Sequence, residues 1–204
     1  MLGSLRIYLS TALLAGVLVL ASTGIAFAGE PTDFVKKNAT QVSELLRQKD
    51  SAKRHEQFSA KLNQIVDFRE LASRALGEHW QARTAEEQQT FLDLLREMLE
   101  ANYRNKLEGN TLGEDYQIEY LEEKTRDKLA IVKTRIKWDS GEETADYKLI
   151  QKDDGWIVYD TIIDDISLVE TYRESYTQII KDDGWDALIR RMRERAKELR
   201  TQNQ

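Results

Sequence analysis

The chain has 204 residues, of which 41% are hydrophobic and 32% are charged, and it contains no cysteine. Without cysteine it cannot be a disulfide-stabilised scaffold, a zinc module held by cysteines or a thiol enzyme. Its 36 acidic and 30 basic residues give a net charge of −6, the wrong sign for a protein held on nucleic acid or on anionic membrane by long-range attraction.

Residues 1–28 are predicted to be a secretory signal peptide that is removed from the mature protein. Arg6 is followed by an apolar stretch from Ile7 to Phe27, which ends in the small-x-small sequence Ala26-Phe27-Ala28. The alternative is an uncleaved anchor, since the stretch approaches the ~20 residues that span a bilayer. No cysteine follows it, so a lipoprotein attachment site is chemically impossible. We expect cleavage after Ala28 and a soluble, exported product.

The remainder, residues 29–204, is predicted to be a single domain. Its one proline, Pro31, lies beside the expected cleavage point, and no Gly/Ser-rich linker interrupts the sequence.

The first part of this domain is predicted to form four helices. Apolar residues recur there at spacings of three and four, the period of a helix with one buried side. Each helix is expected to begin at a residue whose side chain can accept a hydrogen bond from the first turn. These residues are Thr32, Ser51, Asp67 and Thr84, the last two with Glu70 and Glu87 three positions later as in a capping box, and Gly77 is expected to end the third helix.

From Tyr116 onward the period of the apolar residues changes to two, which predicts antiparallel strands joined by short turns. The alternation covers residues 116–120, 130–138, 145–149 and 156–163. On the last of these strands it places Asp160 and Ile162 on the same face as Val158.

Two further helices are predicted to close the chain, one beginning with a capping box at Ser167 and Glu170 and one running from Trp185 to Leu199. The expected fold class is therefore α+β, with helices packed on a curved antiparallel sheet.

Few residues are arranged for known chemistry. The two histidines are isolated, and the chain lacks a His-Glu-x-x-His frame, a Gly-x-Ser-x-Gly elbow and a glycine-rich phosphate loop. We therefore predict no catalytic residue, no metal site and no cofactor. Asp160 keeps three interpretations open: a general base in the pocket of an enzyme, a buried hydrogen-bonding anchor, or an edge residue.

A basic run near the C-terminus has two interpretations. It is interrupted by Glu194 and Glu198 and lacks an aromatic platform, so nucleic-acid binding is not predicted. A solvated helix face and docking to an acidic partner remain open. The run consists of Arg190, Arg191, Arg193, Arg195, Lys197 and Arg200.

Six clusters of residues follow one another in an order and spacing that resemble one family. They are Asp67-Phe68, Ala75-Leu76-Gly77-x-x-Trp80, Phe91 through Tyr103, Gly155-Trp156-x-Val158-x-Asp160, Ser167-Leu168-Val169-x-x-Tyr172-Arg173 and Gly184-x-x-x-Leu188-Ile189. Together with the signal, they resemble the MlaC family, the periplasmic phospholipid-binding component of the Mla lipid-transport system, also called the toluene-tolerance family. The sequence departs from that family at Asp165, where a glycine is common, so Asp165 must accept that backbone geometry.

The resemblance implies a noncatalytic carrier with an NTF2-like fold. Its deep apolar cavity would hold the tails of a phospholipid, with the headgroup near the mouth. The implied role is to shuttle phospholipid through the periplasm, between an outer-membrane lipoprotein-porin complex and an inner-membrane Mla ABC transporter complex, in support of outer-membrane lipid asymmetry. A sister group associated with hopanoid production has similar motifs, so a hopanoid-associated lipid-binding relative remains an alternative, as does an NTF2-like enzyme that uses Asp160 as its base.

Candidate walls of this cavity are the apolar residues on the predicted inner faces of helices and strands. A filled core requires the same kind of side chain, so we expect only some of them to contact lipid. The candidates are Leu76, Trp80, Phe91, Leu95, Leu99, Tyr103, Val132, Ile136, Tyr147, Leu149, Val158, Ile162, Tyr172 and Tyr176.

Overall fold

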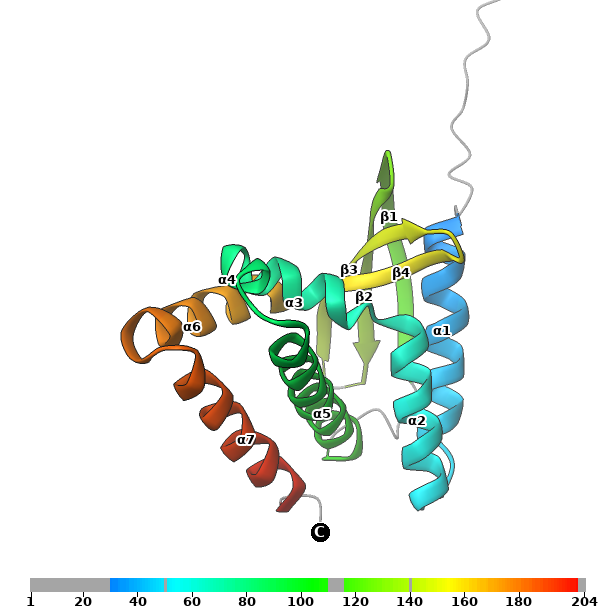
Figure 1. Cartoon of the computed structure of the whole chain (residues 1–204). Coiled ribbons are helices and arrows are strands. Elements are labelled where there is room, and N and C mark those ends of the chain that lie inside the picture. Colours follow the sequence, from blue (N-terminus) through cyan, green and yellow to red (C-terminus); the bar gives the residue numbers. More distant parts are fainter. Residues whose placement is uncertain (1–29, 50, 110–115, 140, 202–204) are drawn as a thin grey trace, which may run out of the picture.

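The computed structural model describes residues 30–49, 51–109, 116–139 and 141–201, with the backbone alone for residues 103–109. The predicted signal peptide, residues 1–28, lies outside the described residues. Within them the chain forms seven helices and a five-stranded antiparallel sheet in the order β1-β2-β3-β4-β5 (Figure 1). The predicted α+β class, with helices packed on an antiparallel sheet, is confirmed.

The helices and strands follow one another along the chain in the predicted order. The helices are α1 (Glu30–Leu46), α2 (Ala52–Ile65), α3 (Phe68–Leu76), α4 (Glu78–Gln81), α5 (Ala85–Gly109), α6 (Leu168–Asp183) and α7 (Trp185–Thr201). The strands are β1 (Gln117–Arg126), β2 (Leu129–Trp138), β3 (Gly141–Lys152), β4 (Gly155–Ile163) and β5 (Ile166–Ser167). The short helix α4, directly after Gly77, was not predicted.

Two groups of helices flank the sheet. Helices α1 and α2 run side by side along it, whereas α3 to α7 form a separate group (Figure 1). The larger of the two hydrophobic clusters lies within that second group and includes the fully buried Phe91, Leu95 and Leu188. The smaller cluster lies between α1 and the sheet, around Val132 and Leu149.

Most of the predicted helix starts are present. The side chains of Ser51, Asp67 and Ser167 each accept a hydrogen bond from the backbone three residues later. The capping box at Thr84 is reciprocal: its N–H donates to Glu87 Oε2 at 2.8 Å, and the Glu87 N–H donates to Thr84 Oγ1 at 3.2 Å. Such caps satisfy N–H groups that have no partner within the helix.

The predicted start at Thr32 is wrong. Helix α1 already begins at Glu30, so Thr32 lies inside its first turn. There the backbone N–H and Oγ1 of Thr32 both donate to Glu123 Oε2, at 2.9 and 2.5 Å. Thr32 therefore fastens α1 to strand β1 instead of capping its own helix.

A β-bulge in β4 changes which residues face the helices α1 and α2. Val158 pairs with Leu149, but Asp160 pairs with the preceding residue, Lys148, so Tyr159 is an extra residue in the ladder. A bulge of one residue reverses the alternation beyond it. The prediction that Asp160 and Ile162 share the face of Val158 is therefore wrong.

The hairpin between β4 and β5 has an unusual backbone. Asp164 and Asp165 have φ angles of 45° and 66°, in the left-handed region that residues other than glycine rarely adopt. They join Ile163 to its partner Ile166, as the two central residues of a tight hairpin turn do. The prediction that Asp165 accepts a geometry favourable to glycine is confirmed.

Candidate functional site: an apolar cavity between two helices and the sheet

A cavity of about 360 Å³ lies between α1, α2 and one face of the sheet. Helix α1 presents Phe34, Val35, Ala39, Val42 and Leu46 to it, and α2 presents Phe58, Leu62 and Ile65. The opposite wall includes Ile118, Ile136, Ala145, Tyr147, Val158 and Ile163 from four strands.

Helix period and strand register together produce this wall. The lining residues of α1 recur every three or four positions, so they form one stripe along the helix. Across the sheet, Ile118 pairs with Ile136, and Ala145 pairs with Ile163. Paired residues project from the same face, so the sheet closes the cavity with neighbouring aliphatic side chains.

Thr161 and Ile163 reach the cavity because of the bulge in β4. They take the face that the alternation predicted for Asp160 and Ile162, and both of them line the cavity. Because of the one extra residue in the ladder, the hydroxyl of Thr161 stands on this wall instead of the carboxylate of Asp160, and Ile163 stands there instead of Ile162.

Few polar side chains line the cavity. Glu143 carries the single charge among the described lining residues, none of which is a lysine or an arginine, and the neutral polar groups belong to Asn38, Thr161, Tyr116, Tyr147 and Trp138. Asn38 is 7% exposed, and its Nδ2 donates to the backbone oxygen of Phe34 at 2.8 Å. The site is suited to an aliphatic ligand, because burying a phosphate there would require compensating charges.

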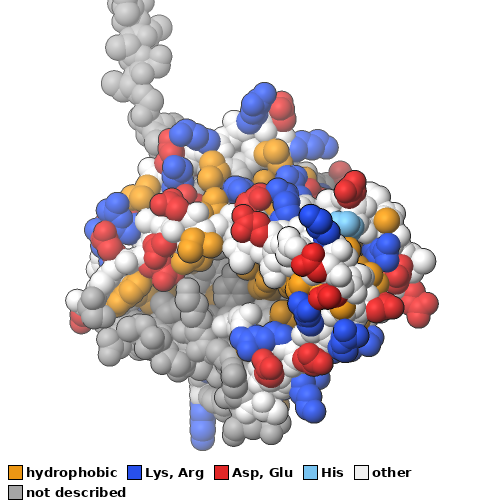
Figure 2. Space-filling model, turned by 90° about the vertical axis from the view of Figure 1, so that its left-hand side faces the viewer, with side chains coloured by type: hydrophobic (Ala, Val, Ile, Leu, Met, Phe, Trp, Pro, Cys, Tyr) orange, Lys and Arg blue, Asp and Glu red, His pale blue; other side chains and the backbone are white. Residues whose placement is uncertain are grey.

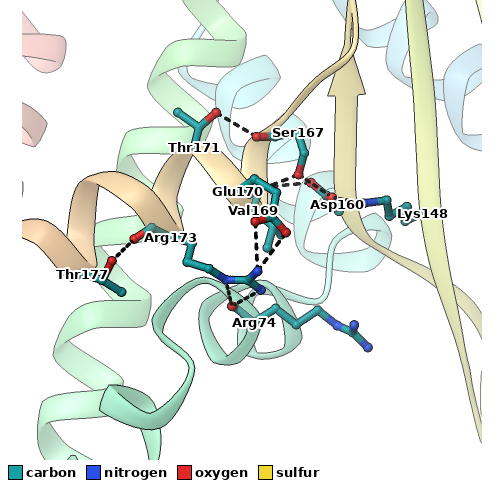
Figure 3. A network of polar contacts seen from close by, with 9 residues as sticks. All are labelled: Arg74, Lys148, Asp160, Ser167, Val169, Glu170, Thr171, Arg173 and Thr177. Carbon is teal, nitrogen blue, oxygen red and sulfur yellow. Dashed lines mark hydrogen bonds and ion pairs between the residues drawn. The ribbon is translucent and has the colours of Figure 1, made fainter.

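Asp160 lies on the other face of β4 and is held by three partners (Figure 3). Its Oδ1 accepts the backbone N–H of Val169 at 3.0 Å. Its Oδ2 accepts Ser167 Oγ at 2.8 Å and Lys148 Nζ at 3.0 Å. With 2% of its surface exposed and no position on the cavity wall, Asp160 is the buried hydrogen-bonding anchor of the three interpretations.

The sequence profile described as "MlaC protein" matches residues 36–194 of the chain. The match includes most of α1, all of α2 and the entire sheet, and thus nearly all of the cavity wall. The chain belongs to the MlaC family.

A solved structure shares the fold of this MlaC-family chain. It is described as the phospholipid-binding protein from Ralstonia solanacearum in complex with a phospholipid, and it superposes with a TM-score of 0.75 at 22% sequence identity. The alignment covers 84% of this chain and 99% of that one. No curated protein matches the chain by sequence.

No membrane-spanning helix was found in the part of this MlaC-family protein that the structure describes. None of the helices in residues 30–49, 51–109, 116–139 and 141–201 combines the length and the apolar character needed to cross a bilayer.

Only some of the residues predicted to line the cavity of this MlaC-family protein do so. Ile136, Tyr147 and Val158 line the cavity between α1, α2 and the sheet. Val132 and Leu149 are fully buried beside them in the smaller cluster, and Ile162 lies on the opposite face of β4. The side chain of Tyr103 lies outside the described residues. Contact of any of these residues with lipid stays a prediction.

The predicted helical wall residues lie in the larger cluster, away from this cavity. Phe91 is at the centre of that cluster, with ring centroids 6.2 Å from Trp80, 5.8 Å from Tyr176 and 5.8 Å from Trp185. Such distances are those of packed aromatic pairs. The cluster contains Leu76, Trp80, Phe91, Leu95, Leu99 and Tyr176, with Tyr172 packed against it.

Sequence reasoning missed the contribution of α1 and α2. Val35, Ala39 and Val42 follow a helical period as clear as that of α5, as do Phe58 and Leu62 of α2. The period showed that each helix has a buried side. The period does not indicate which of the helices lies against the sheet.

The basic run of α7 contains several ion pairs at the surface. Arg191 lies 2.6 Å from Asp183, Arg195 lies 3.0 Å from Glu198, and Arg200 lies 3.0 Å from Glu97 of α5. Figure 2 shows the side of the molecule that carries α6 and α7, where acidic and basic side chains are interspersed. Docking of an acidic partner to α7 stays a prediction.

Proposed function

We propose that this protein is a noncatalytic phospholipid carrier of the periplasm in a Gram-negative cell envelope. It would move lipid between an outer-membrane lipoprotein-porin complex and an inner-membrane Mla ABC transporter complex. The observation that carries the proposal is the apolar cavity between α1, α2 and the sheet, in a chain that belongs to the MlaC family. The phospholipid complex of the structural neighbour supports the same class of ligand.

A carrier that moves lipid through water has to shield its tails. At ~0.8 kcal/mol per methylene, exposing two acyl chains of roughly fifteen methylenes each costs on the order of 24 kcal/mol. The cavity volume of about 360 Å³ falls within the roughly 300–1,000 Å³ of ligand-binding pockets. Its apolar wall is suited to the tails, and the phosphate is expected to stay at the mouth, where water solvates it.

We further propose that the tails contact both walls of the cavity. Ile136, Tyr147 and Val158 supply predicted contacts from the sheet, while Val42 and Phe58 supply contacts from the helices. The predicted residues of the helical cluster would contact a tail only if that cluster opened, because Phe91 and Leu95 are packed among other side chains.

A cavity-filling substitution tests the proposal. Ala39 of α1 lines the cavity, and Thr40, the next residue, is exposed. Ala39→Trp should slow the transfer of fluorescent phospholipid between donor and acceptor vesicles by about tenfold or more, because forcing a large ring into a filled site costs about 1–3 kcal/mol. Thr40→Trp adds the same ring to the solvent side and is the matched control.

The result that contradicts the proposal is equally specific. If folded Ala39→Trp protein transfers lipid as fast as wild type, the lipid does not bind in this cavity. If wild-type protein transfers no lipid, it is not a carrier. Lipid extraction from the wild-type protein, followed by mass spectrometry, distinguishes a phospholipid from a hopanoid.

A further inference from the structure

Asn38 is a buried polar residue in an otherwise apolar part of the cavity wall. It is 7% exposed, and its neighbours along α1 that also line the cavity are Phe34, Val35, Ala39 and Val42. An aliphatic residue would continue this stripe without a buried polar group. A polar side chain that is buried in such a place normally has hydrogen-bond partners.

The amide of Asn38 has unused hydrogen-bonding capacity. An asparagine side chain offers two N–H donors and one carbonyl acceptor. One N–H donates to the backbone oxygen of Phe34 at 2.8 Å. The side chain of Asn38 has no other hydrogen-bond partner in the part of the chain that the structure describes. The second N–H and Oδ1 are therefore available to a ligand in the cavity that Asn38 lines.

The chemistry of a phospholipid limits which part of it this donor can meet. The tails are hydrocarbon and accept no hydrogen bond. The phosphate is excluded from the wall because no lysine or arginine is present among the described lining residues. Between these two regions lie the two ester groups of the glycerol backbone, whose carbonyl oxygens accept hydrogen bonds and lose water when they are buried.

Resting on the proposed carrier function, we propose that Asn38 donates a hydrogen bond to an ester carbonyl of the bound lipid. Asn38 is then a specificity residue that selects ester-linked glycerolipids over lipids whose chains lack a carbonyl at that position. The chains themselves are held by apolar contact, which does not distinguish the two classes.

Two phosphatidylethanolamines with the same chain length, one with ester-linked and one with ether-linked chains, test this role. The ether lipid has no carbonyl, so wild-type protein should bind the ester lipid about three- to tenfold more tightly, the range expected for one hydrogen bond. Asn38→Leu, which is close in shape, should bind the two lipids equally. Competition against a fluorescent phospholipid gives both affinities.

The controls separate this role from a structural one. Asn38→Ala is measured in parallel, in case the leucine variant fails to fold, and circular dichroism verifies the fold of both. Thr40→Val removes a hydroxyl from the exposed side of the same helix, away from the cavity wall, and should keep the preference for the ester lipid.

Two results would overturn the inference while leaving the carrier function intact. One is equal binding of the ester and ether lipids by wild type, and the other is an unchanged ester preference in a folded Asn38 variant. If wild type binds neither lipid, the carrier proposal fails first, and the role of Asn38 fails with it.

Discussion

The carboxylate of Asp160 accepts the backbone N–H of Val169 at 3.0 Å and thereby fastens the N-terminus of α6 to strand β4 (Figure 3). The same carboxylate also accepts hydrogen bonds from Ser167 and from Lys148 of the neighbouring strand. A negative charge at a helix N-terminus is favourable, because the unpaired N–H groups of the first turn carry partial positive charge. Asp160 therefore joins the sheet to the group of helices on its other side.

Asp160→Ala is expected to lower the free energy of unfolding by about 1–3 kcal/mol, since it leaves the buried N–H of Val169 without an acceptor and removes the partner of the Ser167 hydroxyl and of Lys148, which is 31% exposed. Asp160→Asn should cost less, because its amide oxygen still accepts one of these bonds. Denaturant unfolding measures both changes, and Asp153→Ala, at an exposed turn, is the control. A loss below about 0.5 kcal/mol for Asp160→Ala, the usual range of surface substitutions, would contradict the anchoring role.

Asp165→Gly is expected to stabilise the protein by about 1 kcal/mol, because a residue with a side chain is strained at the φ angle of 66°. Gly184→Ala provides the opposite case. At Gly184, φ is 84° and a Cβ would meet no atom of the described part of the chain within 4 Å, so the substitution should destabilise through the backbone alone. Thermal unfolding compares the two variants with wild type. An Asp165→Gly variant that is less stable than wild type would show that Asp165 is not strained at this turn.

Local signals predicted most of the fold. Ser51, Asp67, Thr84 and Ser167 stand at helix starts because their side chains accept hydrogen bonds from residues close in sequence, and such contacts are visible in the order of residues. Thr32 offered the same signal, but a distant residue, Glu123, takes its hydroxyl. Capping patterns do not reveal a competing partner from another part of the chain.

Tyr176→Phe is expected to leave the stability unchanged or to raise it by up to about 1 kcal/mol. The hydroxyl of Tyr176 is buried and has no hydrogen-bond partner among the residues that the structure describes, and burial also raises the pKa of this group far above its ordinary value. Removing an unpaired buried polar atom relieves its desolvation cost while the ring keeps its contacts. Chemical denaturation of the variant checks this, and a loss of more than about 1 kcal/mol would indicate a partner for the hydroxyl.

The capping box at Glu87 predicts a dependence of stability on pH. The hydrogen bond from the Thr84 backbone lowers the pKa of Glu87 below its ordinary 4.5, with smaller contributions from the Thr84 hydroxyl and Arg83. The charged form is thus favoured in the folded state. Its contribution is present above about pH 4.5 and is lost as the pH falls through the folded pKa.

Glu87→Gln tests this dependence. The variant should be less stable than wild type at neutral pH, and the difference in denaturation midpoint should shrink below pH 4.5, the ordinary pKa of the group. A difference that stays constant down to low pH would show that the charge of Glu87 contributes nothing.

The site was less predictable than the fold, for a physical reason. Hydrophobic period identifies a buried side chain, but Phe91 in the packed cluster and Val42 at the cavity follow the same pattern. The choice between a wall and a filled core depends on how helices are placed in space. The exchange of Ile162 for Ile163 on the cavity wall has a different origin, the bulge at Tyr159, which strict alternation cannot anticipate.

Native mass spectrometry of the protein purified from membrane-containing cells tests the central claim most directly. We expect a species heavier than the bare chain by one phospholipid, which Ala39→Trp loses and Thr40→Trp retains. Empty wild-type protein in every preparation, or a lipid adduct that persists in folded Ala39→Trp, would contradict it.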